Sequence, residues 1–190
     1  MLNIGPKPNG EVPGEQEANL REMAAWNFIN REALEGTDPW ILTHEKNIWF
    51  TWKPVEKTLY AFLTKNRDWP RGTRREFNLK SVAISEKSVV SVLGQSGELV
   101  EYQPGTDATT YFEQREDGVH ISCVRAQRIY NNHQWHNPLV LKITHAEPAL
   151  APPAITTQKA EIIKKDEKEN LFFTGKVLKL KVSIKNFFNY

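Results

Sequence analysis

Residues 48–64, IWFTWKPVEKTLYAFLT, decide the fold class of this chain. The two ends of this stretch, residues 48–52 and 58–64, are rich in the aromatic and aliphatic side chains that are enriched in β-strands. Between them, residues 53–57 combine a proline with charged side chains, a composition typical of a turn. The stretch therefore predicts a β-hairpin.

The pattern of short strands continues toward the C-terminus. Further candidate strands cover residues 89–93, 99–102, 109–114, 119–124 and 139–143. Residues 119–124 alternate, so that Val119, Ile121 and Cys123 share one face. Six or seven short strands without a further helix predict a mainly β fold, an antiparallel β-sandwich over residues 41–147.

The first 40 residues predict a different kind of unit. Residues 1–6 read as the end of a strand, and residues 13–29 as an amphipathic helix with a core-facing stripe. The stripe consists of Leu20, Met23, Ala24 and Phe28. Residues 30–40 form a polar connector that ends in an aromatic anchor, Trp40. Since a strand, a helix and a loop cannot bury a core alone, we expect a short strand-helix unit that belongs to something larger.

The C-terminal region predicts a linker and a further piece. Residues 148–153, PALAPP, read as a stiff linker. Residues 154–190 hold two candidate strands, too few to fold alone, and we expect them to be an incomplete further β-segment. After residue 157 the chain has eight lysines, four acidic residues and no arginine. A basic tail can attract nucleic acid or a membrane surface, but lysines that alternate with apolar residues favour a solvated strand face. We predict no nucleic-acid partner.

Composition restricts the functional classes further. The chain has 190 residues and a formal net charge of +2. No stretch approaches the roughly 18 to 20 apolar residues that a membrane span needs. Cys123 is the single cysteine, so no disulfide can form within the chain. Its apolar strand face predicts a small core residue rather than a nucleophile.

Few side chains are candidates for chemistry. His133 and His136 form an HxxH pattern, but no second group of Cys or His supplies the other ligands of a zinc site. Glu113 and Glu116 are expected on a solvated face, and no spacing singles out a pair of carboxylates for acid–base catalysis. Phosphate-binding, dinucleotide-binding and nucleophile-elbow motifs are absent from the sequence. We predict no metal, no cofactor and no catalytic residue.

Two tryptophans are candidates for ligand contact. Trp69 and Trp135 lie in polar, turn-rich surroundings and are expected to be exposed. Exposed tryptophans stack against sugar rings in carbohydrate-binding modules, and they also pack against neighbouring domains. The sequence leaves both interpretations open.

Several motifs, in the same order, resemble those of the glycoside hydrolase family 29 α-L-fucosidases. They are residues 1–6 (MLNIGP), Pro13, Trp26, Asn30, residues 32–33, 36–37 and 39–40, residues 49–51 with 58–61, residues 90–94, and residues 127–132 with 138–143. The early motifs are similar to the end of that family's catalytic barrel, and the later ones to the sandwich that follows it. The resemblance therefore implies that residues 1–40 are the incomplete last strand-helix unit of a (β/α)8-like barrel. Residues 154–190 resemble the incomplete start of an accessory β-domain found after some of these enzymes. Arg31, Glu35 and Asp38 depart from the family pattern of the connector. The resemblance covers residues 1–148.

The resemblance implies a retaining glycosidase that releases α-L-fucose through a covalent intermediate, with an Asp nucleophile and an acidic acid/base. Both groups lie upstream of the MLNIGP-like segment in the family, so we assign no catalytic residue here. Asn3 and Gly5 would lie at the end of the last barrel strand, in the pocket floor or in a turn. The implied partners are a fucosylated glycan and the missing barrel portion, and family members are usually secreted, periplasmic or lysosomal.

The sequence therefore predicts the C-terminal portion of an α-L-fucosidase. Its sandwich is expected to be a structural domain packed on the barrel, and the isolated chain to be inactive. Without the barrel, Leu20, Met23 and Phe28 are expected to form an exposed apolar stripe. The alternative is a stand-alone carbohydrate-binding β-sandwich.

Overall fold

The computed structural model describes residues 4–100, 103–126 and 137–149, all of which belong to a compact unit spanning residues 1–152. The predictions made for residues 1–3, for His133, Trp135 and His136, and for residues 154–190 lie outside these ranges. No helix in the described part of the chain is long and apolar enough to cross a membrane.

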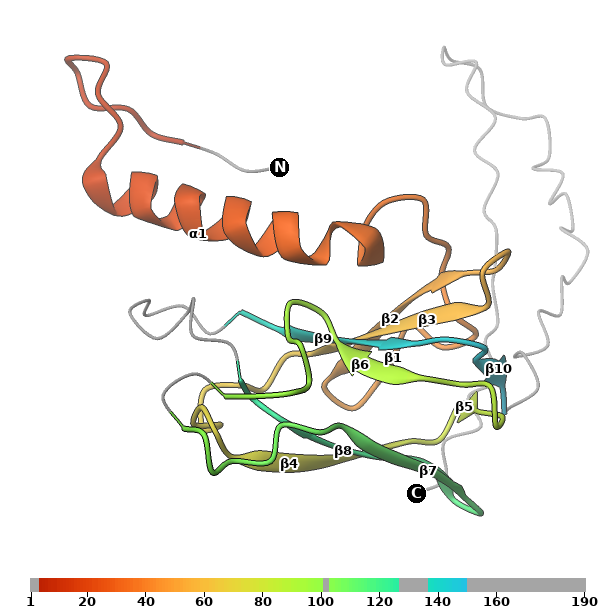
Figure 1. Ribbon diagram of the computed structural model, residues 1–190. Coiled ribbons are helices and arrows are strands. Elements are labelled where there is room, and N and C mark those ends of the chain that lie inside the picture. The colour runs from red at the N-terminus through yellow and green to blue at the C-terminus, as the bar shows by residue number, and fades with distance from the viewer. Residues whose placement is uncertain (1–3, 101–102, 127–136, 150–190) are drawn as a thin grey trace, which may run out of the picture. The chain divides into compact units, whose positions relative to one another are not determined.

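Two antiparallel sheets build the described structure (Figure 1). The larger sheet has the order β1-β2-β3-β9-β6. Its strands are β1 (His44–Glu45), β2 (Ile48–Lys53), β3 (Thr58–Leu63), β9 (Leu139–Ile143) and β6 (Val90–Val92). The smaller sheet has the order β4-β8-β7, with β4 (Arg74–Leu79), β8 (Gly118–Val124) and β7 (Tyr111–Arg115). A short pair joins β5 (Val82–Ala83) to β10 (Glu147–Pro148).

The main hydrophobic core lies between the two sheets. In β3, Leu59, Ala61 and Leu63 face this core, and in β8 Val119, Ile121 and Cys123 face it from the other side. Side chains alternate between the two faces of a strand, which is why every second residue of these segments joins the core. The predicted antiparallel sandwich and the shared face of β8 are therefore confirmed.

Most predicted strands form close to their expected bounds. The hairpin of β2 and β3 pairs antiparallel from Ile48–Leu63 to Lys53–Thr58. Trp40 is buried against the core, as expected of an aromatic anchor, and its Nε1–H donates to Ser81 Oγ at 3.1 Å. Strand β4 was not anticipated, because its RREFNL sequence begins with two arginines rather than with apolar residues.

Two expected boundaries differ. The strand predicted at residues 99–102 does not form at Leu99 or Val100: Leu99 is exposed, and Val100 packs instead with Ala108 and Val124. The predicted linker begins one residue too early, because Pro148 is part of β10 and pairs with Val82. A proline lacks the amide donor but is tolerated in an edge strand of this kind.

Helix α1 (Gly14–Asn30) confirms the predicted helix, and a short 3-10 helix, η1 (Arg31–Ala33), continues it. Pro13 precedes its first turn, where the missing N–H costs no hydrogen bond, and Glu15 and Glu17 lie near the positive end of the helix dipole. In Figure 1, α1 lies on the side of the larger sheet that faces away from the smaller one.

The predicted stripe of α1 does not pack on the sandwich, in line with the expectation that it is left exposed without a barrel. Phe28 is 83% exposed, Ala24 is exposed, and Leu20 and Met23 are only half-buried. The helix residue that packs on the sheet is Trp26, whose ring lies 6.3 Å from that of Phe62 between centroids. The buried positions of α1 are the polar residues Glu22 and Asn30, so polar contacts rather than apolar spacing select the packed face.

The strand expected at residues 1–6 does not form in its described part. Ile4, Gly5 and Pro6 have no regular secondary structure. A β-strand requires a neighbour to satisfy its backbone groups, and within the described ranges no segment pairs with these residues. Gly5 instead donates its N–H to Gln16 Oε1 at 3.1 Å, which is compatible with the turn interpretation of this position.

Trp69 was predicted to be exposed, and this is wrong. It is 1% exposed, and its Nε1–H donates to the carbonyl of Thr73 at 2.9 Å. The ring packs on Phe77, with 5.5 Å between centroids, and the Arg75 guanidinium lies 5.0 Å from its centre. The indole N–H of Trp69 is satisfied by a backbone carbonyl, and the ring is part of the main core although the surrounding sequence is polar.

This packing predicts a large loss of stability in Trp69→Ala. Removing a buried aromatic ring from a core costs about 3–5 kcal/mol of unfolding free energy. Trp49→Ala is the matched control, because Trp49 is 50% exposed. Urea unfolding followed by circular dichroism measures both variants. Equal small losses in the two would contradict the buried position of Trp69.

Candidate functional site

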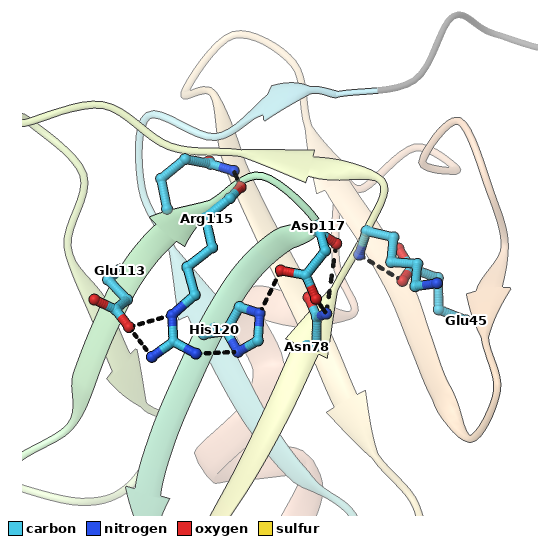
Figure 2. Close-up of polar contacts among 8 residues, drawn as sticks. Glu45, Asn78, Glu113, Arg115, Asp117 and His120 are labelled. Atoms are coloured by element: carbon cyan, nitrogen blue, oxygen red, sulfur yellow. Dashed lines mark hydrogen bonds and ion pairs between the residues drawn. The ribbon is translucent and has the colours of Figure 1, made fainter.

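A network of polar side chains lies on the hairpin of β7 and β8 and the neighbouring strand β4 (Figure 2). It contains Asn78 from β4, Glu113 and Arg115 from β7, His120 from β8, and Asp117 from the turn. Strand pairing brings them together: Glu113 lies opposite His120 on one side, and Asn78 lies opposite His120 on the other.

The turn that joins β7 to β8 positions Asp117. Arg115 pairs with Gly118, which leaves Glu116 and Asp117 as a two-residue loop. Gly118 has a φ of 134°, and a Cβ placed there would lie 2.5 Å from the carbonyl oxygen of Leu79. Only glycine fits both this backbone conformation and this close approach.

The carboxylate of Asp117 has two side-chain partners. His120 Nε2 lies 2.7 Å from Asp117 Oδ1, and Asn78 Nδ2 donates to Asp117 Oδ2 at 2.7 Å. The hydrogen bond from His120 is the largest cause that holds the pKa of Asp117 below its ordinary value of 3.8. Asp117 is therefore an anion at neutral pH and unsuited to act as a general acid.

The histidine is fixed from both sides. Arg115 Nη1 lies 3.3 Å from His120 Nδ1, and a guanidinium can only donate. Nδ1 therefore accepts, which leaves the proton of the neutral ring on Nε2, directed at Asp117. Arg115 also forms an ion pair with Glu113. These contacts join β7, β8 and the turn between them, so the network stabilises its own hairpin.

A second carboxylate, Glu45, connects the two sheets. Its Oε2 accepts the N–H of Lys80 at 2.7 Å, and its Oε1 accepts the N–H of Ser81 at 2.8 Å as well as the Ser81 hydroxyl. Ser81 is fully buried and also receives the indole N–H of Trp40. Sequence analysis missed this contact because Glu45 and Ser81 are 36 positions apart, and no local pattern links them.

Comparison with known proteins relates the chain to one group of enzymes. It is 27% identical over 180 residues to a putative α-L-fucosidase of Caenorhabditis elegans, a match that covers 85% of this chain and 34% of that protein. A plasma α-L-fucosidase of Rattus norvegicus is 36% identical over 73 residues, which cover 37% of this chain and 15% of that protein. The chain is related to the α-L-fucosidases. The predicted resemblance is thereby confirmed.

A solved structure supports the same fold. The α-L-fucosidase from Vibrio sp. strain EJY3 matches with a TM-score of 0.52 and 19% sequence identity, over 84% of this chain and 25% of that one. No protein-family profile matches the chain. The chain thus spans about a third of the length of the Caenorhabditis elegans α-L-fucosidase, and a smaller share of the Rattus norvegicus and Vibrio enzymes.

The structure places three of the residues that the sequence analysis considered as candidates for chemistry, Glu113, Glu116 and Cys123. Glu113 and Glu116 are exposed, as expected. Cys123 is fully buried and free, as expected of a core residue. Within residues 4–100, 103–126 and 137–149, no group of three metal-binding side chains comes together.

The environment of Cys123 predicts an unreactive thiol in the native protein. Burial raises the pKa of Cys123 to about 12, and the thiolate is the species that alkylating reagents attack. Iodoacetamide at pH 8 should therefore leave the folded chain unlabelled and add one group per chain in denaturant, as mass spectrometry measures. Rapid labelling of the folded protein would contradict this.

The network around Asp117 predicts acid sensitivity. Because the folded-state pKa of Asp117 lies below its ordinary value, its contribution to stability is complete above about pH 4 and is lost as pH falls through the folded pKa. Asp117→Asn should lower the melting temperature near neutral pH, and should flatten its decline between pH 5 and pH 3. Glu116→Gln, a neighbouring exposed residue, is the charge-matched control. An unchanged acid profile in Asp117→Asn would contradict the assignment.

Proposed function

We propose that this chain is the C-terminal portion of a longer α-L-fucosidase. The observation that carries the proposal is the match to the Caenorhabditis elegans protein, which extends over 85% of this chain but only 34% of that protein. Because most of this chain matches only a part of that longer protein, we interpret the chain as the corresponding part of a similar enzyme. The full protein would then release α-L-fucose from fucosylated glycans, with retention at the reacting carbon.

In this proposal the sandwich has a structural role. Residues 41–147 form the sandwich domain, residues 1–40 the end of the catalytic barrel, and residues 154–190 the start of an accessory β-domain. The exposed side chains of Phe28 and Leu34 support a further partner near α1, because large apolar groups of this kind are usually covered. The barrel of the same enzyme is the occupant that the relatives favour.

The isolated chain is proposed to be inactive. Retaining hydrolysis needs a nucleophile and an acid/base that face each other across one bond, about 5–5.5 Å apart. The carboxylates described above are engaged differently: Asp117 and Glu113 hold the β7–β8 hairpin, and Glu45 binds backbone N–H groups. The chemistry is therefore assigned to the portion of the enzyme that this chain does not match.

Activity measurements test the proposal directly. The purified chain should not hydrolyse an aryl α-L-fucoside, because the reacting carboxylates are not in it. Co-expression with the upstream portion of the Caenorhabditis elegans relative should give more turnover than either part alone. If hydrolytic activity co-purifies with the chain through successive chromatography steps, the proposed inactivity is refuted. If co-expression gives no more turnover than either part alone, the result counts against the structural role.

The carbohydrate-binding alternative is weakened by the burial of Trp69, which removes one of its two proposed platforms. Trp135 lies outside the described residues. Calorimetric titration with a fucosylated oligosaccharide distinguishes the two interpretations, because the structural domain should give no heat of binding. Binding that disappears in Trp135→Ala but persists in Trp49→Ala would favour the binding module instead.

A further inference from the structure

A row of polar side chains crosses the outer face of the larger sheet beneath η1. Thr51, Tyr60 and Lys142 lie opposite one another on three adjacent strands, in the pairs Thr51–Tyr60 and Tyr60–Lys142. Tyr60 is fully buried although its hydroxyl is polar. The neighbouring row on this face is apolar and includes Phe62 and Val140. A buried polar row of this kind requires a partner from outside the sheet.

Glu32 of η1 supplies that partner. Its Oε2 accepts the Tyr60 hydroxyl at 3.1 Å and forms a 2.6 Å ion pair with Lys142 Nζ. Burial of the phenol, followed by the charge of Glu32, raises the pKa of Tyr60 and keeps its hydroxyl a donor. The carbonyl of the next residue, Ala33, accepts the Thr51 hydroxyl at 2.7 Å. All three side chains of the row therefore bind η1.

Helix α1 itself also makes polar contacts with the sandwich. Trp26 Nε1 donates to the carbonyl of Pro138 at 2.8 Å, and Asn137 Nδ2 donates to Glu22 Oε1 at 3.1 Å. Trp26 is the α1 residue that packs against the apolar cluster on this face. The main core between the two sheets takes no residue from α1. The sandwich core therefore does not depend on the helix.

We propose that Glu32, together with Tyr60 and Lys142, forms a latch that holds α1 on the sandwich and that can open while the sandwich stays folded. An isolated surface ion pair contributes little, but this carboxylate also satisfies a buried hydroxyl. Removing it leaves both Tyr60 and Lys142 without that partner. Release of α1 would then expose Phe62 and Val140 but not the main core.

Hydrogen–deuterium exchange of the full chain tests the latch, with peptides from α1 compared with peptides from β3 and β8. In Glu32→Ala, the amides of α1 should exchange about tenfold faster than in the wild type, because a hydrogen bond to a charged group is lost. The amides of β8 should be unchanged. Glu35→Ala is the matched control, since Glu35 pairs only with Arg31 on the exposed side of the same segment in the described contacts.

Two milder variants separate the latch from general destabilisation. Tyr60→Phe keeps the buried ring and removes the hydroxyl, and Lys142→Met keeps the aliphatic stem and removes the charge. Each should accelerate exchange in α1, and combining either with Glu32→Ala should add little, because all three act through one carboxylate. Wild-type exchange of α1 in Glu32→Ala, or an equal acceleration in α1 and β8, would overturn the proposal. The experiment needs no fucosidase activity and is independent of the proposed function.

Discussion

The burial of β3 on both of its faces constrains the rest of the structure, because a strand without a solvated side needs an apolar layer above and below it. All six residues of β3 are buried. Leu59, Ala61 and Leu63 meet the smaller sheet, whereas Tyr60 and Phe62 are covered by η1 and Trp26 of α1. An antiparallel sheet commonly leaves one face in water, and here the helical segment takes the place of water. The position of α1 follows from this requirement.

The two faces of the larger sheet are held by different kinds of interaction. Between the sheets, close-packed aliphatic and aromatic side chains exclude water, and the contact is non-directional. On the helix side, hydrogen bonds from Tyr60, Thr51 and Trp26 fix a particular geometry. Hydrogen bonds are directional, so they fix the orientation of the helix on the sheet more closely than apolar packing does. A single substitution can also remove one of them without removing the others. These hydrogen bonds therefore orient the helix on the sheet, although the helix contributes no residue to the main core.

The polar side chains of the described structure serve mainly to hold the fold. Glu45 fastens β1 to the turn before β5, and the network around His120 fastens the β7–β8 hairpin. Both Glu45 and Asp117 accept hydrogen bonds from donors of the same chain. These contacts are compatible with the structural role proposed above.

The sequence by itself determined the β-sandwich, its hairpin of β2 and β3, the helix from residue 14, and the relationship to the fucosidases. These features depend on local periodicity and on short motifs, which neighbouring residues encode. Tertiary structure alone decided that Trp69 is buried, that β4 forms despite its arginines, and that Trp26 is the residue of α1 that packs on the sheet. It also brought Glu45 to Ser81 and Glu32 to Lys142. Those pairs lie 36 and 110 positions apart, and a contact between distant residues has no signal in local spacing because the fold of the intervening chain creates it.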